Sequence, residues 1–251
     1  MTGYSGAFFL RKRVICMCEY SSTDDEKYMR RAIELAKKGL GWTNPNPMVG
    51  AVIVKDGKII GEGYHKKYGE LHAETSALSS CTKSPEGATI YVTLEPCCHH
   101  GKQPPCTEAI IKAGIKRVVI GSLDPNPLVS GKGMQILREH NIQVNNKLVC
   151  NRECIDMNYV FFHYIKEKLP YVIVKYAQTL DGKIATHNGL SKWITGEAAR
   201  ENVHMDRHRY SAIMVGINTV LKDDPMLNCR SKAIENPHQP VRIVCDTRLR
   251  I

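Results

Sequence analysis

Residues 94–106, Leu-Glu-Pro-Cys-Cys-His-His-Gly-Lys-Gln-Pro-Pro-Cys, together with His-Ala-Glu at residues 72–74, are the most informative part of this chain. One imidazole, from His72, and two thiolates, from Cys97 and Cys106, make a three-ligand zinc site with one coordination position left for water. Zinc lowers the pKa of such a water to about 7. Glu74, near the start of the same expected helix as His72, can move protons beside the metal without binding it. The stretch therefore predicts a catalytic zinc site.

These residues largely match the zinc-deaminase signature, H-x-E followed by P-C-x-x-C, in which the Glu acts as general acid and base. His72, Glu74 and Cys97 fit that signature. Cys106 departs from it, because it lies nine residues after Cys97 rather than three. The longer ligand loop separates this chain from deaminases that keep the short spacing.

A purely structural zinc site is the alternative, since such a site needs four protein ligands and Cys98, His99 or His100 could supply the fourth. Glu74 counts against it, because a structural site has no use for a proton-shuttling carboxylate. The other cysteines are interpreted as ordinary thiols: Cys16, Cys18, Cys81, Cys150, Cys154, Cys229 and Cys245.

The residues around the zinc stretch alternate between helix and strand patterns. Apolar residues at helical spacing, short β-branched runs and an Asp56-Gly57 turn signal mark the elements. We expect helices at 24–40, 72–80, 107–113, 133–140 and 152–166, and strands at 48–54, 58–64, 88–94, 116–120 and 142–144. This alternation predicts a three-layer α/β domain.

Pro170 ends the last of these helices, because proline cannot continue a helix, and we place a domain boundary there. Beyond it we expect a strand at 171–176, a turn at 181–182, a helix at 196–207 and strands at 212–215 and 241–245. The predicted organisation is a disordered N-terminal extension at 1–23, a zinc-containing domain at 24–168 and the N-terminal part of a second domain at 169–251.

Composition excludes several classes of protein. No run of about 18 apolar residues is present, so a membrane span is not expected. The apolar patch before residues 11–13 is too short for a secretory signal, and its basic residues follow it rather than precede it. The chain is too large for a small disulfide scaffold. The net charge of +10 suits nucleic acid or a phosphorylated small substrate, but no Lys/Arg run exceeds three residues. We expect a cytoplasmic protein.

Further motifs follow one another along the chain. They are Asn44-Pro45-Asn46-Pro47-Met48-Val49-Gly50, Glu95-Pro96-Cys97-Cys98-His99-His100-Gly101, Asp124-Pro125-Asn126-Pro127, Gln178-Thr179-Leu180-Asp181-Gly182-Lys183, Ser191-Lys192-Trp193-Ile194-Thr195-Gly196 and Asp223-Asp224-Pro225. With the long loop between Cys97 and Cys106, the series resembles the bifunctional deaminase/reductase family of riboflavin biosynthesis, from about residue 24 onward. The resemblance implies a cytidine-deaminase-like domain followed by an incomplete dihydrofolate-reductase-like α/β domain.

For the first domain, the resemblance implies zinc-dependent deamination of 2,5-diamino-6-(5-phosphoribosylamino)pyrimidin-4-one. The implied Zn²⁺ ligands are His72, Cys97 and Cys106, with Glu74 as proton shuttle. Asn46 would hold the pyrimidine, although it could be a plain turn residue. The substrate phosphate would suit Lys102 or Lys132, although either could be a solvated lysine.

For the second domain, the resemblance implies NADPH-dependent reduction of the ribosyl group. The implied nicotinamide contacts are Ala177, Trp193, Thr219 and Asp223. The implied substrate contacts are Ser191, Arg207, Leu227 and Arg230, and an arginine fork suits a phosphate. Trp193 could equally be a core aromatic, and Thr219 a helix cap. Since no glycine-rich turn for a pyrophosphate follows residue 169, we expect this domain to be incomplete and its reductase activity to be absent or severely impaired.

Two other functions stay open. A nucleic-acid base deaminase would explain the positive charge and would bind a nucleic-acid column with a steep salt dependence. The long ligand loop and the start of a reductase domain count against it. A non-catalytic zinc module predicts that Glu74→Ala changes no activity. We expect a small phosphoribosylated pyrimidine as substrate, no nucleic-acid or membrane partner and, from the resemblance, a homo-oligomer.

Overall fold

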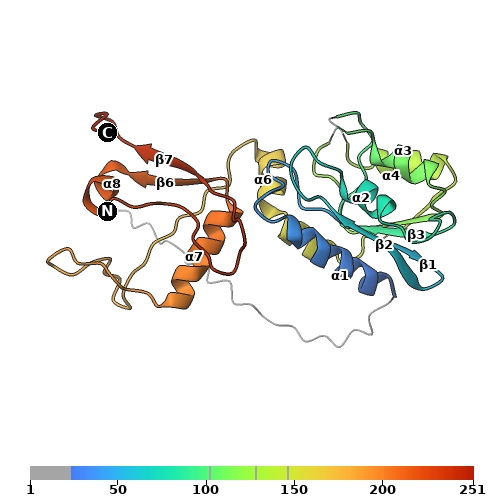
Figure 1. The fold of residues 1–251 in the computed structure, drawn as a ribbon. Helices are drawn as coiled ribbons and strands as arrows, with labels where there is room; N and C mark the ends of the chain where they lie inside the picture. Colours follow the sequence, from blue (N-terminus) through green and yellow to red (C-terminus); the bar gives the residue numbers. More distant parts are fainter. Residues whose placement is uncertain (1–23, 102, 128, 146) are drawn as a thin grey trace, which may run out of the picture.

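A computed structural model describes residues 24–101, 103–127, 129–145 and 147–251, so the extension expected at 1–23 lies outside the described residues. Two sheets are present in the described part (Figure 1). The first has five strands in the order β2-β1-β3-β4-β5, and the second pairs β6 with β7. The strands are β1 (Gly50–Lys55), β2 (Lys58–Tyr64), β3 (Thr89–Val92), β4 (Arg117–Ile120), β5 (Gln143–Val144), β6 (Ala212–Gly216) and β7 (Val241–Cys245).

The first sheet mixes antiparallel and parallel pairing. β1 and β2 form the hairpin expected at Asp56-Gly57, where both residues have a positive φ, 52° and 70°, as a two-residue hairpin turn requires. β3 runs antiparallel to β1, whereas β4 and β5 run parallel to β3. The loops that follow β3 and β4 therefore leave the same edge of the sheet, where the backbone N–H of Glu95 donates to the carbonyl oxygen of Ser122 at 2.9 Å.

Helices cover both faces of the first sheet. The helices among the described residues are α1 (Asp24–Ala36), the 3₁₀ turn η1 (Lys37–Gly39), α2 (Ala73–Ser79), α3 (Cys106–Lys112), α4 (Lys132–Glu139), α5 (Asn151–Met157), α6 (Tyr159–Glu167), α7 (Glu197–Arg209) and α8 (Ile217–Asp223). Met29 of α1 and Cys154 of α5 are buried against one face of the sheet. Ala77, Ile110 and Leu137, from α2, α3 and α4, are buried against the other. The expected three-layer α/β arrangement is confirmed.

Two glycines let helices lie directly on the strands. A Cβ at Gly50 would lie 1.9 Å from the carbonyl oxygen of Ala32 in α1. A Cβ at Gly63 would lie 2.2 Å from the amide nitrogen of Ala77 in α2. Any larger residue would push the helix away, so Gly63 fixes the position of the helix that begins directly after His72.

The second sheet is small and parallel. β6 and β7 run in the same direction and α8 connects them, while α7 precedes β6. The expected helix at 196–207 and strands at 212–215 and 241–245 correspond to α7, β6 and β7, but the sequence pattern did not predict α8. No helix in the described part of the chain is long and apolar enough to cross a membrane.

Two expected elements are wrong. The helix expected at 152–166 is divided into α5 and α6 at Asn158, whose side-chain amide accepts from the backbone N–H of Met48 and donates to its carbonyl oxygen, each at 2.8 Å. This pairing holds Asn158 at φ −110°, ψ 24°, outside helical geometry. The segment at 171–176 is not a strand, because no described strand pairs with it, and its Val172 is 75% exposed.

Candidate metal centre

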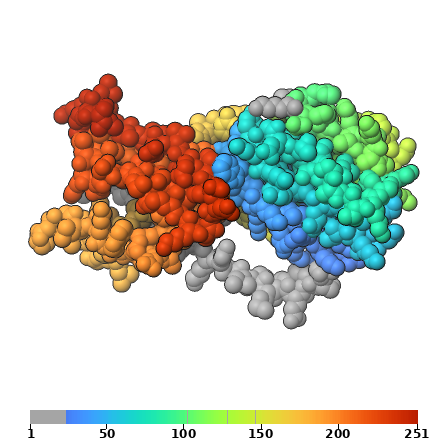
Figure 2. Space-filling view, in the orientation of Figure 1, coloured from blue at the N-terminus to red at the C-terminus, as the bar shows by residue number. Residues whose placement is uncertain are grey.

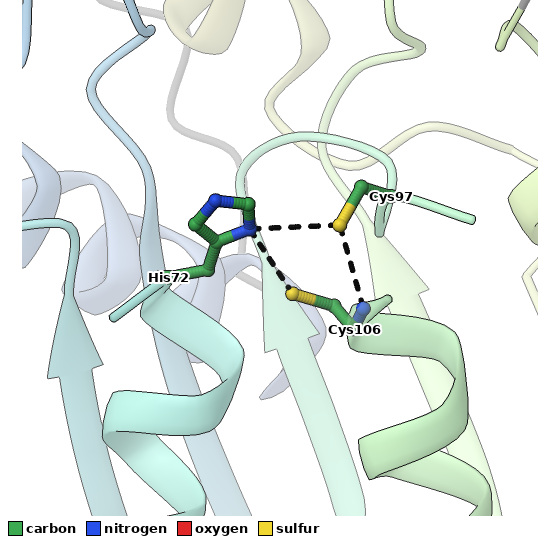
Figure 3. A group of neighbouring side chains, drawn as sticks. All are labelled: His72, Cys97 and Cys106. Atoms are coloured by element: carbon green, nitrogen blue, oxygen red, sulfur yellow. Dashed lines mark hydrogen bonds between the residues drawn. The ribbon is translucent and has the colours of Figure 1, made fainter. Parts of the chain in front are cut away.

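Three side chains from separate elements meet beyond the ends of β3 and β4 (Figure 3). His72 lies directly before α2, Cys106 is the first residue of α3, and Cys97 lies in the loop after β3. Two of the three therefore stand where a packed helix begins. The fold brings together residues that are up to 34 positions apart in sequence.

The three ligand atoms are close enough to share one metal ion. Nδ1 of His72 lies 3.3 Å from Sγ of Cys106 and 3.5 Å from Sγ of Cys97, and all three atoms lie within 4.8 Å of one another. Sγ of Cys97 also accepts the backbone N–H of Cys106 at 3.4 Å, the third contact drawn in Figure 3. Two sulfurs and one imidazole nitrogen are donors that zinc prefers. The residues present therefore fit a zinc ion.

The neighbouring residues of the ligand loop do not complete a four-ligand set. Among the described residues, the candidate metal group consists of His72, Cys97 and Cys106 alone. His100 points elsewhere, since its Nε2 lies 3.4 Å from a carboxylate oxygen of Glu108. A three-residue set leaves a coordination position open, as catalytic zinc sites do.

The contacts within the group favour a thiolate at Cys97. The hydrogen bond from the Cys106 thiol, opposed by burial and helped by His72, lowers the pKa of Cys97 to about 4. The same bond and burial raise the pKa of Cys106, and the bond to Cys97 raises the pKa of His72. A metal ligand must be deprotonated, so a thiolate that the protein already stabilises favours metal binding.

Glu74 is a buried acid beside this group. It lies in the first turn of α2 and is 4% exposed. Burial first, and then the negative charge of Cys97, raise the pKa of Glu74 to about 7. A carboxyl group with a pKa near neutrality can both take and give a proton there. The position is the one expected for a proton shuttle, and that role stays a prediction.

A cavity of about 360 Å³ opens beside the metal group. His72, Glu74 and Cys97 line one part of it, and Asn46 lines another. The volume lies within the range of small-molecule sites in proteins. The structure thus brings Asn46, which we expect to hold a pyrimidine, to the cavity that also contains the expected proton shuttle.

His65 is a cavity residue that sequence reasoning missed. It is 3% exposed, with Nδ1 at 3.0 Å from the carbonyl oxygen of Leu71 and Nε2 at 3.2 Å from Nδ2 of Asn46. A carbonyl oxygen only accepts, so Nδ1 carries the proton and Nε2 of the neutral ring accepts from Asn46. This leaves Oδ1 of Asn46 available to a ligand. No local motif distinguishes His65 from other histidines.

The sequence motifs assigned no role to two carboxylates near the metal group, Glu95 and Asp124. Glu95 is 3% exposed and accepts the backbone N–H groups of Gly131, at 2.9 Å, and Met134, at 3.3 Å, so that it links the ligand loop to the start of α4. Asp124 lines the cavity, and burial raises its pKa. Both belong to motifs quoted above, so their positions in those motifs were the available signal.

Two lysines are suggested for the substrate phosphate, Lys102 and Lys132. Lys102 lies outside the described residues. Lys132 is exposed at the start of α4 and does not line the cavity. The structure therefore does not place Lys132 beside the cavity.

Part of the substrate set expected in the second domain comes together. Nη1 of Arg207 donates to the carbonyl oxygen of Asn228 at 2.9 Å, and Nη1 of Arg230 donates to the Asn228 side chain. Burial, and then the nearby charge of Arg230, lower the pKa of Arg207. Leu227 is 8% exposed in the same loop. Ser191 is exposed in the segment before α7.

The four expected nicotinamide contacts lie in the second part of the chain, before α7 and on α8. Ala177 lies in the segment before α7, and Thr219 and Asp223 are exposed on α8. Trp193 is 72% exposed, with the guanidinium of Arg200 at 4.5 Å from its ring centre, so it is not a core aromatic. None of the four lines the cavity beside the metal group.

Comparisons with known proteins match both parts of the chain. Residues 22–122 match the cytidine and deoxycytidylate deaminase zinc-binding region, and residues 170–251 match the RibD C-terminal domain. The riboflavin biosynthesis protein RibD of Actinobacillus pleuropneumoniae is 59% identical over 92% of this chain and 60% of its own length. That of Escherichia coli K12 is 44% identical over 90% of this chain and 64% of its own length.

Solved structures of related proteins also match both parts of the chain. A diaminohydroxyphosphoribosylaminopyrimidine deaminase/5-amino-6-(5-phosphoribosylamino)uracil reductase from Thermotoga maritima has a TM-score of 0.84 and 52% identity, over 90% of this chain and 64% of its own. Acinetobacter baumannii RibD has a TM-score of 0.85 and 47% identity, over 91% of this chain and 65% of its own. The chain thus spans less than two thirds of the length of these relatives, and the match includes both sheets. Together, the two matched domains and these identities show that the chain belongs to the RibD family of riboflavin biosynthesis proteins.

Proposed function

We propose that this chain hydrolytically deaminates 2,5-diamino-6-(5-phosphoribosylamino)pyrimidin-4-one with the help of zinc. The observation that carries this proposal is the place of Glu74, a buried acid whose pKa is raised to about 7, in a cavity that also contains His72 and Cys97. The Thermotoga maritima relative is a diaminohydroxyphosphoribosylaminopyrimidine deaminase as well as a reductase. Sequence identity of 52% to it supports the same substrate class here.

His72, Cys97 and Cys106 would hold the zinc ion. When bound there, zinc supplies Lewis-acid chemistry, because it polarises an oxygen ligand and lowers the pKa of water. Glu74 in its carboxylate form takes a proton from the attacking water and then gives a proton to the departing amine, which leaves as ammonia. Burial keeps the protonated and ionised forms of Glu74 close in free energy near neutral pH, so neither transfer is strongly uphill.

The pyrimidine would lie in the cavity beside Asn46. Because Nδ2 of Asn46 donates to Nε2 of His65, its amide oxygen stays available as an acceptor for the substrate. That oxygen would accept a hydrogen bond from an amino group or a ring N–H of the pyrimidine. The buried His65 thereby fixes which way the Asn46 amide is turned.

The test is ammonia release by the zinc-loaded chain and by Glu74→Gln. Loss of a general acid and base costs about 10²–10⁴-fold in rate, so we expect about a 10³-fold lower turnover at unchanged zinc content. Glu70→Gln is the matched control, since Glu70 lines the same cavity but is exposed. Equal ammonia release by Glu74→Gln and the unsubstituted chain would show that Glu74 is not the proton shuttle, and no release by either would support a non-catalytic zinc module instead.

The proposal is confined to deamination. The nicotinamide contacts expected at Ala177, Trp193, Thr219 and Asp223 stay predictions from the sequence. A homo-oligomeric state, a cytoplasmic location and the absence of a nucleic-acid partner stay predictions from the sequence.

A further inference from the structure

Residues 40–47, here called the Asn46 loop, connect the cavity to the second part of the chain. At one end, Asn46 lines the cavity. At the other, Gly41, Trp42 and Asn44 contact residues of α7 and of the segments that follow it. Figure 2 shows the orange and red atoms of the second part in direct contact with the blue atoms of the first.

The contact is tight at Gly41 and Trp42. Gly41 has φ +81°, and a Cβ there would lie 2.6 Å from both Cε1 and the carbonyl oxygen of His208, so no larger side chain fits. The ring of Trp42 meets His208 and His238 edge to face, with ring centres 6.4 Å and 5.7 Å apart. Nδ2 of Asn44 donates to the hydroxyl of Ser211.

His208 is the centre of this contact. It is 5% exposed, and its Nδ1 accepts the backbone N–H of His238 at 3.0 Å. The ring also makes a hydrogen bond to the backbone of Leu40. One neutral imidazole therefore joins α7, the segment before β7 and the first residue of the Asn46 loop.

Backbone hydrogen bonds carry this contact to the cavity wall. The N–H of Asn46 donates to the carbonyl oxygen of Thr43 at 2.8 Å, and the N–H of Tyr68 donates to that of Trp42 at 3.1 Å. Asn46 and Tyr68 both line the cavity. Nζ of Lys67, next to Tyr68, lies 5.3 Å from the ring centre of Trp42. A shift of Trp42 would therefore move two parts of the cavity wall at once.

We propose that His208 and Trp42 are positioning residues for the pyrimidine-binding wall, so that the second part of the chain sets how well the first binds its substrate. This inference rests on the proposed deamination. Neither residue lines the cavity or belongs to the metal group, so both act through Asn46 and Tyr68. The kinetic signature is a change in KM with little change in the proton-transfer chemistry at Glu74.

The first experiment compares His208→Ala with His208→Gln in the full zinc-loaded chain. Misplacement of a substrate contact by a fraction of an ångström lowers catalytic efficiency on the order of tenfold. We expect this loss to fall on substrate binding, so His208→Ala should raise KM about tenfold while kcat and zinc content stay unchanged. Glutamine offers both an N–H donor and an oxygen acceptor, so His208→Gln should restore most of the affinity. Asn202→Ala, at an exposed position of α7, is the matched control and should leave KM unchanged.

The second experiment needs no substrate. Amide hydrogen exchange at residues 41–47 and at Tyr68 should be about tenfold faster in His208→Ala, with β1 and β3 unaffected, because loss of the contact opens the loop locally. Trp42→Leu tests the same contact from the other side and should give the same pattern, even if His208→Ala does not fold.

The outcomes separate the two proposals. An unsubstituted chain that releases no ammonia would overturn the proposed function, and hydrogen exchange alone would then decide whether His208 holds the loop. An active chain in which His208→Ala and Trp42→Leu keep the original KM and the original exchange rates would overturn the positioning role while leaving deamination in place.

Discussion

Glu95 stands directly before Pro96 and Cys97, and its buried carboxylate accepts two backbone N–H groups at the start of α4. Gly133 lets α4 come this close, since a Cβ there would lie 2.3 Å from the carbonyl oxygen of Pro96. The bonds of Glu95 therefore hold the backbone that carries the Cys97 ligand. Groups that orient a metal ligand typically contribute about 10- to 100-fold to metal affinity.

Glu95→Gln should accordingly bind zinc at least about tenfold more weakly, because one of its two side-chain acceptors becomes an N–H₂ donor facing N–H groups. Competition with a chromophoric chelator measures the affinity. Glu139→Gln, at the exposed end of the same helix, should bind zinc as the unsubstituted chain does. Unchanged affinity in Glu95→Gln would show that α4 does not hold the ligand loop.

At this scale the sequence predicts residues whose chemistry depends on type and spacing. His72, Cys97 and Cys106 form the expected group, because few roles require one imidazole and two thiols around an H-A-E motif. His65 could not be predicted in the same way, since its role depends on burial and on contacts with Leu71 and Asn46 that only the fold creates.

Helix α1 is attached to the first sheet by an ion pair. Asp25, in its first turn, accepts two hydrogen bonds from Arg117 of β4, at 2.9 Å and 2.6 Å, and one from Tyr91 of β3 at 2.9 Å. The bonds from Arg117 lower the pKa of Asp25 below its ordinary value. The folded state therefore binds the proton of Asp25 more weakly than the unfolded state does.

The stabilisation by Asp25 should be complete above the unfolded pKa, about 3.9, and should be lost as the pH falls through the lower folded pKa. Asp25→Asn should cost about 1 kcal/mol of unfolding free energy at pH 7, given that the pair is partly exposed, and much less near pH 2. Urea unfolding of both proteins at each pH measures this difference. Asp24→Asn, at the exposed neighbouring position, should show no such pH dependence; an equal cost of Asp25→Asn at both pH values would argue against the ion pair.

At the scale of elements, the pattern predicts best where one face of an element is buried. The strands and helices of the first sheet lie within a few residues of the expected ranges, because their apolar periodicity reflects two real faces. Asn158 interrupts a helix through a contact with Met48, which lies 110 positions away and leaves no local signal. The strand expected at 171–176 has the right composition, but a strand also needs a neighbour.

The whole first part of the molecule is linked at the metal group, since its ligands come from the start of α2, the loop after β3 and the start of α3. An ion present at 1,000 times its dissociation constant stabilises the folded state by about 4 kcal/mol. A strong chelator that removes the ion should therefore lower the melting temperature by about 10 °C. Adding zinc should reverse the change. Cys106→Ser should abolish the response to chelator, whereas Cys245→Ser, at an exposed thiol, should retain it. A melting temperature indifferent to chelator in the unsubstituted chain would mean that the group binds no metal ion that stabilises the fold.

Because Cys106 is buried, its place in the metal group bears on the order in which an ion and a pyrimidine can bind. Its side chain is 0% exposed, while His72 and Cys97 face the cavity. The cavity is therefore the route by which the ion, as well as the pyrimidine, would enter. On the proposed function, the ion must arrive first, and a bound pyrimidine then closes its way out. Bound substrate would therefore slow the dissociation of zinc, and the protein would lose its metal ion most slowly during turnover.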